Sequence, residues 1–479
     1  MHEEATKTTK PREVLKLKHP DAEVSPEQPW RDDALDRKQL AERLTRLIRD
    51  EQEPFIISID GEWGSGKSFL LKRWQRELEG DGFRAIYYNA WEDDFCDDPL
   101  LSIIGQLSDH LKKGELKSLA DEMGKIAVPL LKKNALSLLS KATGLTFEVD
   151  LNRRDLLQEY REQRQSKTEL KGHLAKMSAA AFAETGRPLV FIIDELDRCR
   201  PTFAIELLER VKHIFDVPGL VFIFGVNRGE ICKSLQSVYG EIDADLYLHR
   251  FFDLEFSLPV TNTASFCRRL MYKYRLEEHF DALNGNSYYK KRSAEYNRLI
   301  QGFPSLCVRL DLSLREIEYG VRLIALTART LEEGQDMYPT LLSFLIVLKL
   351  KNPTLYRQFM RGERRASELL NYVDELETPF SGERDYEGWL HVAEAYLYAV
   401  EEPISNHTGG TTAVDQLRRK AQGNELTRPE LLSNRTGASK IDKAKWLLEK
   451  IKSEVPTLHG RSTLEYLDSL IDLQKTYPM

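Results

Sequence analysis

One short segment constrains the fold more than any other part of the sequence: FIISIDGEWGSGKSFLLKRW, residues 55–74. It contains the pattern GxxxxGK[ST], formed here by Gly61, Glu62, Trp63, Gly64, Ser65, Gly66, Lys67 and Ser68. Glycines at this spacing let the backbone curl so that successive N–H groups point at one anion. An apolar run of strand length precedes the pattern and a helical pattern follows it, which is the context that a phosphate-binding loop requires.

The polar residues of this loop have expected roles. The Lys67 ammonium would reach the β- and γ-phosphates of a nucleotide, and the Ser68 hydroxyl would ligate magnesium. The helix that begins near Lys67 would add the positive end of its dipole, and we count the next residue, Phe69, among the nucleotide contacts. The alternative, a glycine-rich turn that matches the pattern by chance, is disfavoured by the flanking strand and helix.

A second segment supplies the carboxylates that a phosphate loop lacks. LVFIIDELD, residues 189–197, is a buried-strand pattern that ends in Asp194 and Glu195. We expect Asp194 to hold magnesium and Glu195 to polarise the attacking water as a general base. The alternative is a strand that ends in solvated acids. Because a complete phosphate loop is present in the same chain, the two segments together predict an ATP–magnesium site and a hydrolase.

Strand and helix patterns alternate through the first half of the chain. The strand candidates are residues 54–60, 83–91, 188–197, 219–227 and 250–259. This alternation predicts an α/β fold with a doubly wound, mostly parallel sheet. The glutamate next to Asp194 predicts that strand 219–227 lies between the phosphate-loop strand and the carboxylate strand. Asn227, at its end, would then either contact the γ-phosphate as a sensor or cap the following helix.

The patterns divide the chain into four expected parts. These are a flexible leader at 1–30, a nucleotide-binding core at 31–260, a helical lid at 261–330 and a helical C-terminal interaction region at 331–479. A helical insertion at about 105–186, with a hinge near 143–155, separates the phosphate loop from the carboxylates. We expect it to pack on the core or on a partner; an amphipathic helix on a membrane surface is the alternative. A polar break is expected at 401–416.

Composition excludes several classes of protein. The formal net charge is -7 over 479 residues, so no global basic excess indicates nucleic-acid binding, although the basic stretch near 153–176 leaves a local contact open. The five cysteines are scattered without a CxxC pair, which argues against a disulfide framework or zinc site and favours the cytoplasm. Apolar runs are all far shorter than the roughly 20 residues of a transmembrane helix.

Three segments resemble the KAP family of P-loop NTPases. IDGEWGSGKS resembles the family's phosphate loop, including a tryptophan at the position of Trp63. YYNAWEDD resembles its NAW motif, here Asn89, Ala90 and Trp91. IIDELDRCRP resembles its Walker B extension, with Asp197, Arg198, Cys199 and Pro201 in register. With weaker similarities at 35–44, 246–259 and 312–324, the resemblance spans about residues 30–330.

The resemblance implies an additional-strand ATPase related to STAND and AAA-like enzymes. Such a protein would be a switch or motor in a homo-oligomeric or multi-protein assembly, here of a prokaryotic phage-defence or mobile-element type. A nucleotide-gated scaffold with little hydrolysis and a nucleic-acid-stimulated ATPase remain alternatives. The family often carries membrane helices between its two Walker motifs, whereas this chain has a soluble insertion there.

The resemblance also implies basic residues that sense or complete the site, in trans or from the lid. Arg250 and Arg198 are candidates, and Arg315 resembles the residue after a family proline–arginine pair, although Ser313 and Leu314 precede it here. Surface salt bridges are an equally open interpretation for each arginine. We expect Trp63 and Trp91 to pack on one another beneath the loop; the alternative is that Trp63 shapes the nucleotide pocket.

Overall fold

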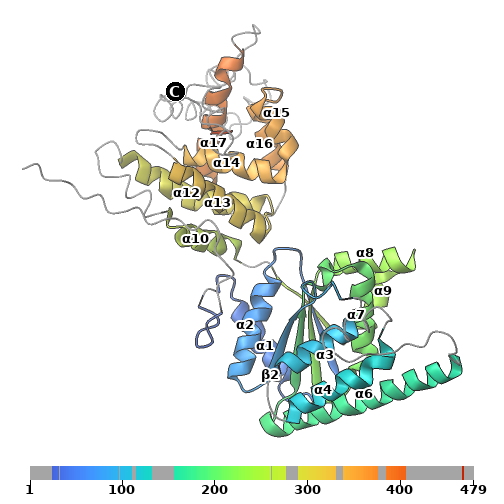
Figure 1. Cartoon of the computed structure of the whole chain (residues 1–479). Helices are drawn as coiled ribbons and strands as arrows, with labels where there is room; N and C mark the ends of the chain where they lie inside the picture. The colour runs from blue at the N-terminus through green and yellow to red at the C-terminus, as the bar shows by residue number, and fades with distance from the viewer. Residues whose placement is uncertain are drawn as a thin grey trace, which may run out of the picture. The chain divides into compact units, whose positions relative to one another are not determined.

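The computed structural model describes residues 24–31, 33–96, 98–110, 115–131, 156–259, 262–276, 290–330, 338–375, 384–405 and 467–468. The chain divides into two compact units: an α/β unit, Ala22–Thr261, and a helical unit that includes Asn262–Met479 (Figure 1). The predicted hinge near 143–155 lies outside the described residues. The predicted break at 401–416 begins within a helix that continues to residue 405, and its remainder lies outside them.

The α/β unit contains a five-stranded, entirely parallel sheet with the order β2-β3-β4-β1-β5. Its strands are β1 (Phe55–Asp60), β2 (Arg84–Asn89), β3 (Leu189–Asp194), β4 (Leu220–Val226) and β5 (Leu254–Ser257). The predicted doubly wound sheet is therefore confirmed, and β4 lies between β1 and β3 as expected. The fifth strand is shorter than its pattern, because residues 250 and 251 still close the turn after the preceding helix by hydrogen bonds to Tyr247 and Leu248.

Helices cover both faces of this sheet (Figure 1). One layer contains α1 (Arg37–Ile48) and α2 (Lys67–Gly80), and the other contains α3 (Pro99–His110), α4 (Glu115–Ala127), α6 (Leu156–Thr185), α7 (Pro201–Ile214) and α8 (Arg228–Tyr239). A short helix, α9 (Ala244–Leu248), follows α8. The described part of the insertion between the phosphate loop and the carboxylates is helical, as predicted.

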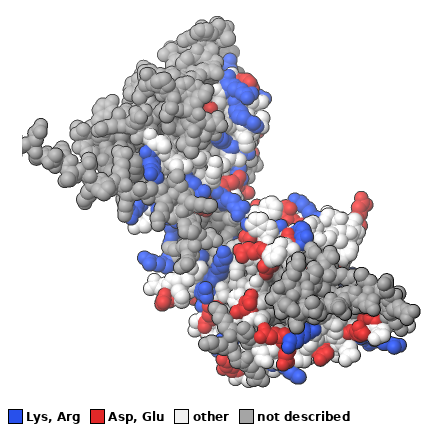
Figure 2. Space-filling view, in the orientation of Figure 1, with Lys and Arg blue, Asp and Glu red and all other residues white. Residues whose placement is uncertain are grey.

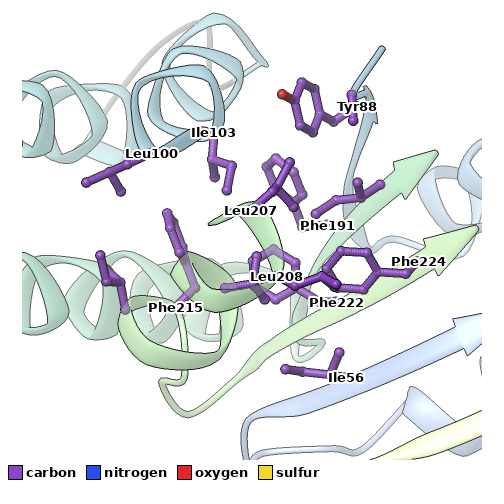
Figure 3. Packing of buried hydrophobic residues seen from close by; sticks show 14 of the residues in the cluster. Ile56, Tyr88, Leu100, Ile103, Phe191, Leu207, Leu208, Phe215, Phe222 and Phe224 are labelled. Atoms are coloured by element: carbon purple, nitrogen blue, oxygen red, sulfur yellow. The ribbon is translucent and has the colours of Figure 1, made fainter. Parts of the chain in front are cut away.

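The sheet is buried on both faces, which explains the continuous apolar runs of its strands. Every residue of β3 and β4 is buried. Successive side chains point to opposite faces, so Phe222 and Phe224 pack on the layer of α3 and α7, whereas Val221 and Ile223 pack toward α1 and α2. Figure 3 shows the side chains of Phe191, Phe222 and Phe224 next to one another on the first of these faces. This rigid sheet positions the loops at its carboxyl edge.

Most of the described residues of the helical unit lie in helices, as predicted. They form α10 (Thr263–Lys273), α12 (Lys290–Arg309), α13 (Leu314–Thr330), α14 (Pro339–Lys351), α15 (Pro353–Met360), α16 (Ala366–Glu375) and α17 (Arg384–Ser405). Helix α14 is apolar on all sides and its residues 339–348 are buried, so it forms the centre of this unit. Across the described residues of the whole chain, the helices are too short or too polar to cross a membrane.

Candidate active site

The phosphate loop joins the carboxyl end of β1 to the start of α2. Gly64 and Gly66 have φ angles of 85° and 90°, in the left-handed region that favours glycine. A Cβ on Gly61 would lie 2.7 Å from the Ser65 hydroxyl oxygen, so a side chain there would force Ser65 to move. The Gly61 N–H donates to the Val226 carbonyl at the end of β4 (3.1 Å). The glycine spacing read from the sequence therefore corresponds to a curled backbone at the N-terminus of a helix, which fits an anion.

Lys67 is the buried cation of this loop. Its ammonium donates to the carbonyl oxygens of Gly61 and Glu62, the latter at 3.1 Å. Burial lowers the pKa of the Lys67 ammonium, and the charges of Asp197, Asp194 and Asp60 oppose that shift. The ammonium thus lies inside the loop, near the carboxylates that end β1 and β3, where it fits a phosphate group. Ser68 and Phe69 follow it in the first turn of α2, both partly exposed.

Asp194 ends β3 and is almost completely buried, with 1% of its surface exposed. Its Oδ2 accepts a hydrogen bond from the Tyr87 hydroxyl (2.7 Å), and its Oδ1 accepts one from the Glu195 N–H (2.9 Å). Burial and the neighbouring Asp194 charge raise the pKa of Tyr87, which keeps it a hydrogen-bond donor. The carboxylate is therefore fixed in orientation, as a magnesium ligand must be.

Glu195 has a backbone conformation that is unusual for its residue type. Its φ and ψ are 60° and 24°, in the left-handed region where a non-glycine residue is strained. Its Oε1 forms an ion pair with Arg198 (3.0 Å), and its Oε2 accepts a hydrogen bond from the Asn89 amide (3.3 Å). Burial raises the pKa of the Glu195 carboxyl, and Arg198 opposes that rise. A carboxyl with a raised pKa is better matched to general-base catalysis near neutral pH.

Sequence reasoning did not assign a role to Asn89, although the residue stood in a recognised motif. It ends β2, next to Asp194 in the parallel register. Its partner Glu195 is 106 positions further along the chain, so the contact depends on the pairing of β2 with β3. Neighbouring carboxyl ends of parallel strands meet at one edge, and that rule is the signal that could have found it.

The expectation that Trp63 and Trp91 pack on one another beneath the loop is wrong. The two side chains are 45% and 51% exposed. The Trp63 indole donates to Asp197 (2.5 Å), whereas the Trp91 ring lies under the Arg198 guanidinium, 5.4 Å from its centroid. Each tryptophan is thus held by a polar partner on the turn η2 (Leu196–Arg198). Trp63 is held by its indole N–H, and Trp91 by the face of its ring, which attracts the Arg198 cation.

Three other residues were candidates from the sequence: Asn227, Arg250 and Arg315. Asn227 caps α8: its side chain accepts a hydrogen bond from the Glu230 N–H (3.4 Å). It follows the carboxyl end of β4, the strand that lies between β1 and β3. Arg250 lies before the amino end of β5, whereas the carboxyl end of β5 pairs with Asp60, where the phosphate loop begins. The Arg250 guanidinium lies 5.9 Å from the Tyr247 ring centroid. Arg315 is exposed in the first turn of α13, in the helical unit. Within the α/β unit, the structure gathers Lys67, Asp194, Glu195 and Arg198.

A further residue at the site carried no assigned role in the sequence. Arg37, in α1, is 1% exposed and donates to the carbonyl oxygens of Pro259 (2.5 Å) and Ser65 (3.1 Å). It connects the phosphate loop with the segment that leaves β5. Burial lowers the pKa of its guanidinium. An arginine in an amphipathic helix normally lies on the solvent face, so its helical pattern gave no signal of this role.

The parallel sheet with a strand inserted between the phosphate loop and a strand-end acidic pair defines a P-loop NTPase of the additional-strand class. The KAP family P-loop domain matches residues 37–331. This chain belongs to that family, and the resemblance seen in its motifs is confirmed. No curated protein shows significant sequence similarity to it.

Three solved structures are similar to this chain at low sequence identity. The ORC2 protein of Aeropyrum pernix in ADPNP–ADP complexes has 12% identity and a TM-score of 0.28, over 92% of this chain and 94% of that one. AMPPCP-bound DnaA from Aquifex aeolicus has 11% identity and a TM-score of 0.23, over 70% and 91%. A DNA replication initiation factor has 12% identity and a TM-score of 0.25, over 73% and 92%. With TM-scores this low, these proteins carry no argument about the function.

Proposed function

We propose that this protein binds ATP with magnesium and hydrolyses it. The observation that carries the proposal is the shared edge of the sheet: β4 separates the phosphate loop, after β1, from Asp194 and Glu195, after β3. In this arrangement Lys67 and the loop N–H groups bind the phosphates, and Ser68 and Asp194 hold magnesium. The metal would supply positive charge against the phosphate oxygens.

Glu195 is the residue to which we assign proton acceptance from the attacking water. Its carboxylate is fixed by Arg198 and Asn89 on opposite oxygens, and burial raises its pKa toward the range useful for a base. Tyr87 keeps Asp194 oriented without competing for the proton, since its own pKa is raised. We therefore assign magnesium binding to Asp194 and proton acceptance to Glu195, two adjacent carboxylates with different hydrogen-bond partners.

The test separates binding from hydrolysis. Lys67→Ala should lose binding of Mg-ATP, because the buried cation of the loop is removed. Glu195→Gln keeps the size and shape of the side chain and one acceptor oxygen but removes its charge and its basicity, so it should bind Mg-ATP normally and lose about 10² to 10⁴ in turnover. Calorimetric titration and a phosphate-release assay measure the two effects. Unchanged turnover of Glu195→Gln would remove Glu195 from the role of base.

We extend the proposal to a switch or motor that acts within an assembly, which rests on family resemblance alone. Protein partners or a second copy would bind through the helical insertion and the C-terminal helices. Mass measurement of the protein with ATP and with ADP tests the assembly. Assembly without phosphate release would favour a nucleotide-gated scaffold instead. Turnover that rises with DNA or RNA and falls with salt would favour a nucleic-acid-stimulated enzyme.

Charge distribution favours protein partners over nucleic acid. On the face that Figure 2 shows, acidic and basic side chains are interspersed over the described part of the α/β unit and form no continuous basic stripe there. A role in prokaryotic phage defence or a mobile element, and a cytoplasmic location, belong to the same extension. In a host that carries the gene with its neighbours, loss of protection in Lys67→Ala would support the defence role, and intact protection would exclude it.

A further inference from the structure

One hydrogen bond connects the phosphate loop with the segment that carries Glu195. The indole Nε1 of Trp63 donates to Oδ2 of Asp197 at 2.5 Å. Trp63 lies within the loop, and Asp197 lies on η2, two residues after Glu195. An indole N–H is a donor only, and an ionised carboxylate is among the strongest acceptors that a protein offers. This bond therefore joins two segments that meet only at the carboxyl edge of the sheet.

Asp197 is more buried than a surface acid would be. It is 8% exposed, and its second oxygen, Oδ1, is buried without a hydrogen-bond partner among the described residues. A buried carboxylate is unfavourable unless an opposite charge compensates it. Lys67 supplies that charge: of the carboxylates that raise the pKa of its ammonium, Asp197 has the largest effect. Asp197 thus contacts the loop through the Trp63 indole, and its charge acts on the Lys67 ammonium from further away.

The backbone of the loop is part of the same network. The Glu62 carbonyl accepts a hydrogen bond from the Lys67 ammonium (3.1 Å). That carbonyl and the Trp63 N–H belong to one planar peptide group. Because the Trp63 side chain is anchored to Asp197, a shift of the loop that displaces the Trp63 Cα must strain or break the Trp63–Asp197 bond. The conformation of the loop is therefore linked to the position of η2.

We propose that Asp197 is a positioning residue which, through Trp63, fixes the phosphate loop relative to Glu195. The inference rests on the proposed ATPase function and adds a residue to it. Without the bond, Lys67 and the loop glycines still bind the phosphates, but their distance from Glu195 is no longer fixed. A misplacement of about 1 Å can lower turnover about 10²-fold while substrate still binds. Loss of Asp197 should therefore lower kcat with little effect on KM.

The experiment uses Trp63→Phe, Asp197→Ala, Asp197→Asn and the double variant Trp63→Phe/Asp197→Ala. Trp63→Phe and Asp197→Ala should each lower kcat for Mg-ATP by about 10- to 100-fold, with the Kd for Mg-ADP changed less than about threefold. The double variant should be no slower than the slower single variant, because both remove one interaction. Asp197→Asn keeps an acceptor oxygen and should recover part of the rate. Trp30→Phe and Asp216→Ala are the controls: they make the same substitutions at a partly buried tryptophan and an exposed aspartate.

Additive losses in the double variant, or a Kd that rises in step with the loss of kcat, would overturn the proposal. Trp63 is 45% exposed, so Trp63→Phe tests it even where Asp197→Ala fails to fold.

Hydrogen exchange of amides 61–68 in the nucleotide-free protein gives a second readout, independent of hydrolysis. Exchange should be faster in Trp63→Phe and Asp197→Ala and unchanged in Asp216→Ala. Equal exchange in all variants would refute the positioning role. If the wild-type protein releases no phosphate, the proposed function fails, whereas this exchange comparison still decides the role of Asp197.

Discussion

The amide of Asn89 donates a hydrogen bond to the carboxylate of Glu195, Nδ2 to Oε2 at 3.3 Å. This bond lowers the pKa of the Glu195 carboxyl, against the rise that burial causes. Removing it in Asn89→Ala should raise that pKa, so the base is deprotonated only at higher pH. We expect the acidic limb of the pH–kcat profile to move to higher pH. Turnover at pH 7 should fall about tenfold, part of what a positioned base contributes.

Asn89→Asp is the stronger form of the same test. A second carboxylate beside Glu195 disfavours its charged form, so the acidic limb should move further than in Asn89→Ala. A pH–kcat profile identical to that of the wild-type protein in both variants would contradict the role of Asn89.

Gly225, in β4, is a position where a single methyl group should disturb the site. A Cβ there would lie 2.4 Å from Leu71 Cδ1 and 3.0 Å from Asp194 Oδ1. Gly225→Ala should lower the free energy of unfolding by about 1–3 kcal/mol, the usual result of overpacking. It should also displace Asp194, so that a higher magnesium concentration is needed for half-maximal turnover. Gly105→Ala is the control, since nothing lies within 4 Å of its Cβ and it should be neutral or stabilising by up to about 1 kcal/mol. Denaturant unfolding measures both.

Arg37 is expected to stabilise the phosphate loop from outside it. Arg37→Ala leaves the carbonyl oxygens of Ser65 and Pro259 without their charged donor. It should lower the free energy of unfolding by about 2 kcal/mol or more and weaken Mg-ATP binding. Arg37→Lys keeps the charge but not the two-pronged geometry, so it should recover only part of the loss. Arg43→Ala, an exposed arginine of the same helix, should change stability by less than about 0.5 kcal/mol.

Glu195 should reduce stability near neutral pH. Its pKa is raised in the folded protein, so the unfolded chain loses the proton first, from about pH 4 upward. The penalty therefore develops above that pH and is absent below it. Glu195→Gln should unfold at a higher temperature than the wild-type protein at pH 7, and the difference should vanish near pH 4. Thermal unfolding at several pH values measures this, and a difference independent of pH would contradict it.

The sheet and the acidic pair could be predicted because each depends on local patterns. Apolar runs such as LVFIFGV are buried on both faces, and the glycine spacing of 61–66 admits few backbones. The inserted position of β4 followed from the residue beside Asp194. These features require no knowledge of which distant side chains meet.

The side-chain contacts of the site could not be predicted in the same way. Trp63 meets Asp197 across 134 positions and Arg37 meets Pro259 across 222. Helical periodicity gives no reason to bury Arg37, and two motif tryptophans suggest packing rather than two separate polar partners. Such pairs depend on loop conformations at the edge of the sheet, where local propensity is weakest.

The inserted strand β4 also sets the distance between the phosphate loop and the acidic pair. Neighbouring strands lie about 4.8 Å apart, so β4 holds the ends of β1 and β3 about 10 Å from each other. A phosphate on the loop and a water molecule must both fit within this span if Glu195 is to reach the water. Strand β4 therefore acts as a spacer, and its fully buried side chains keep that width constant.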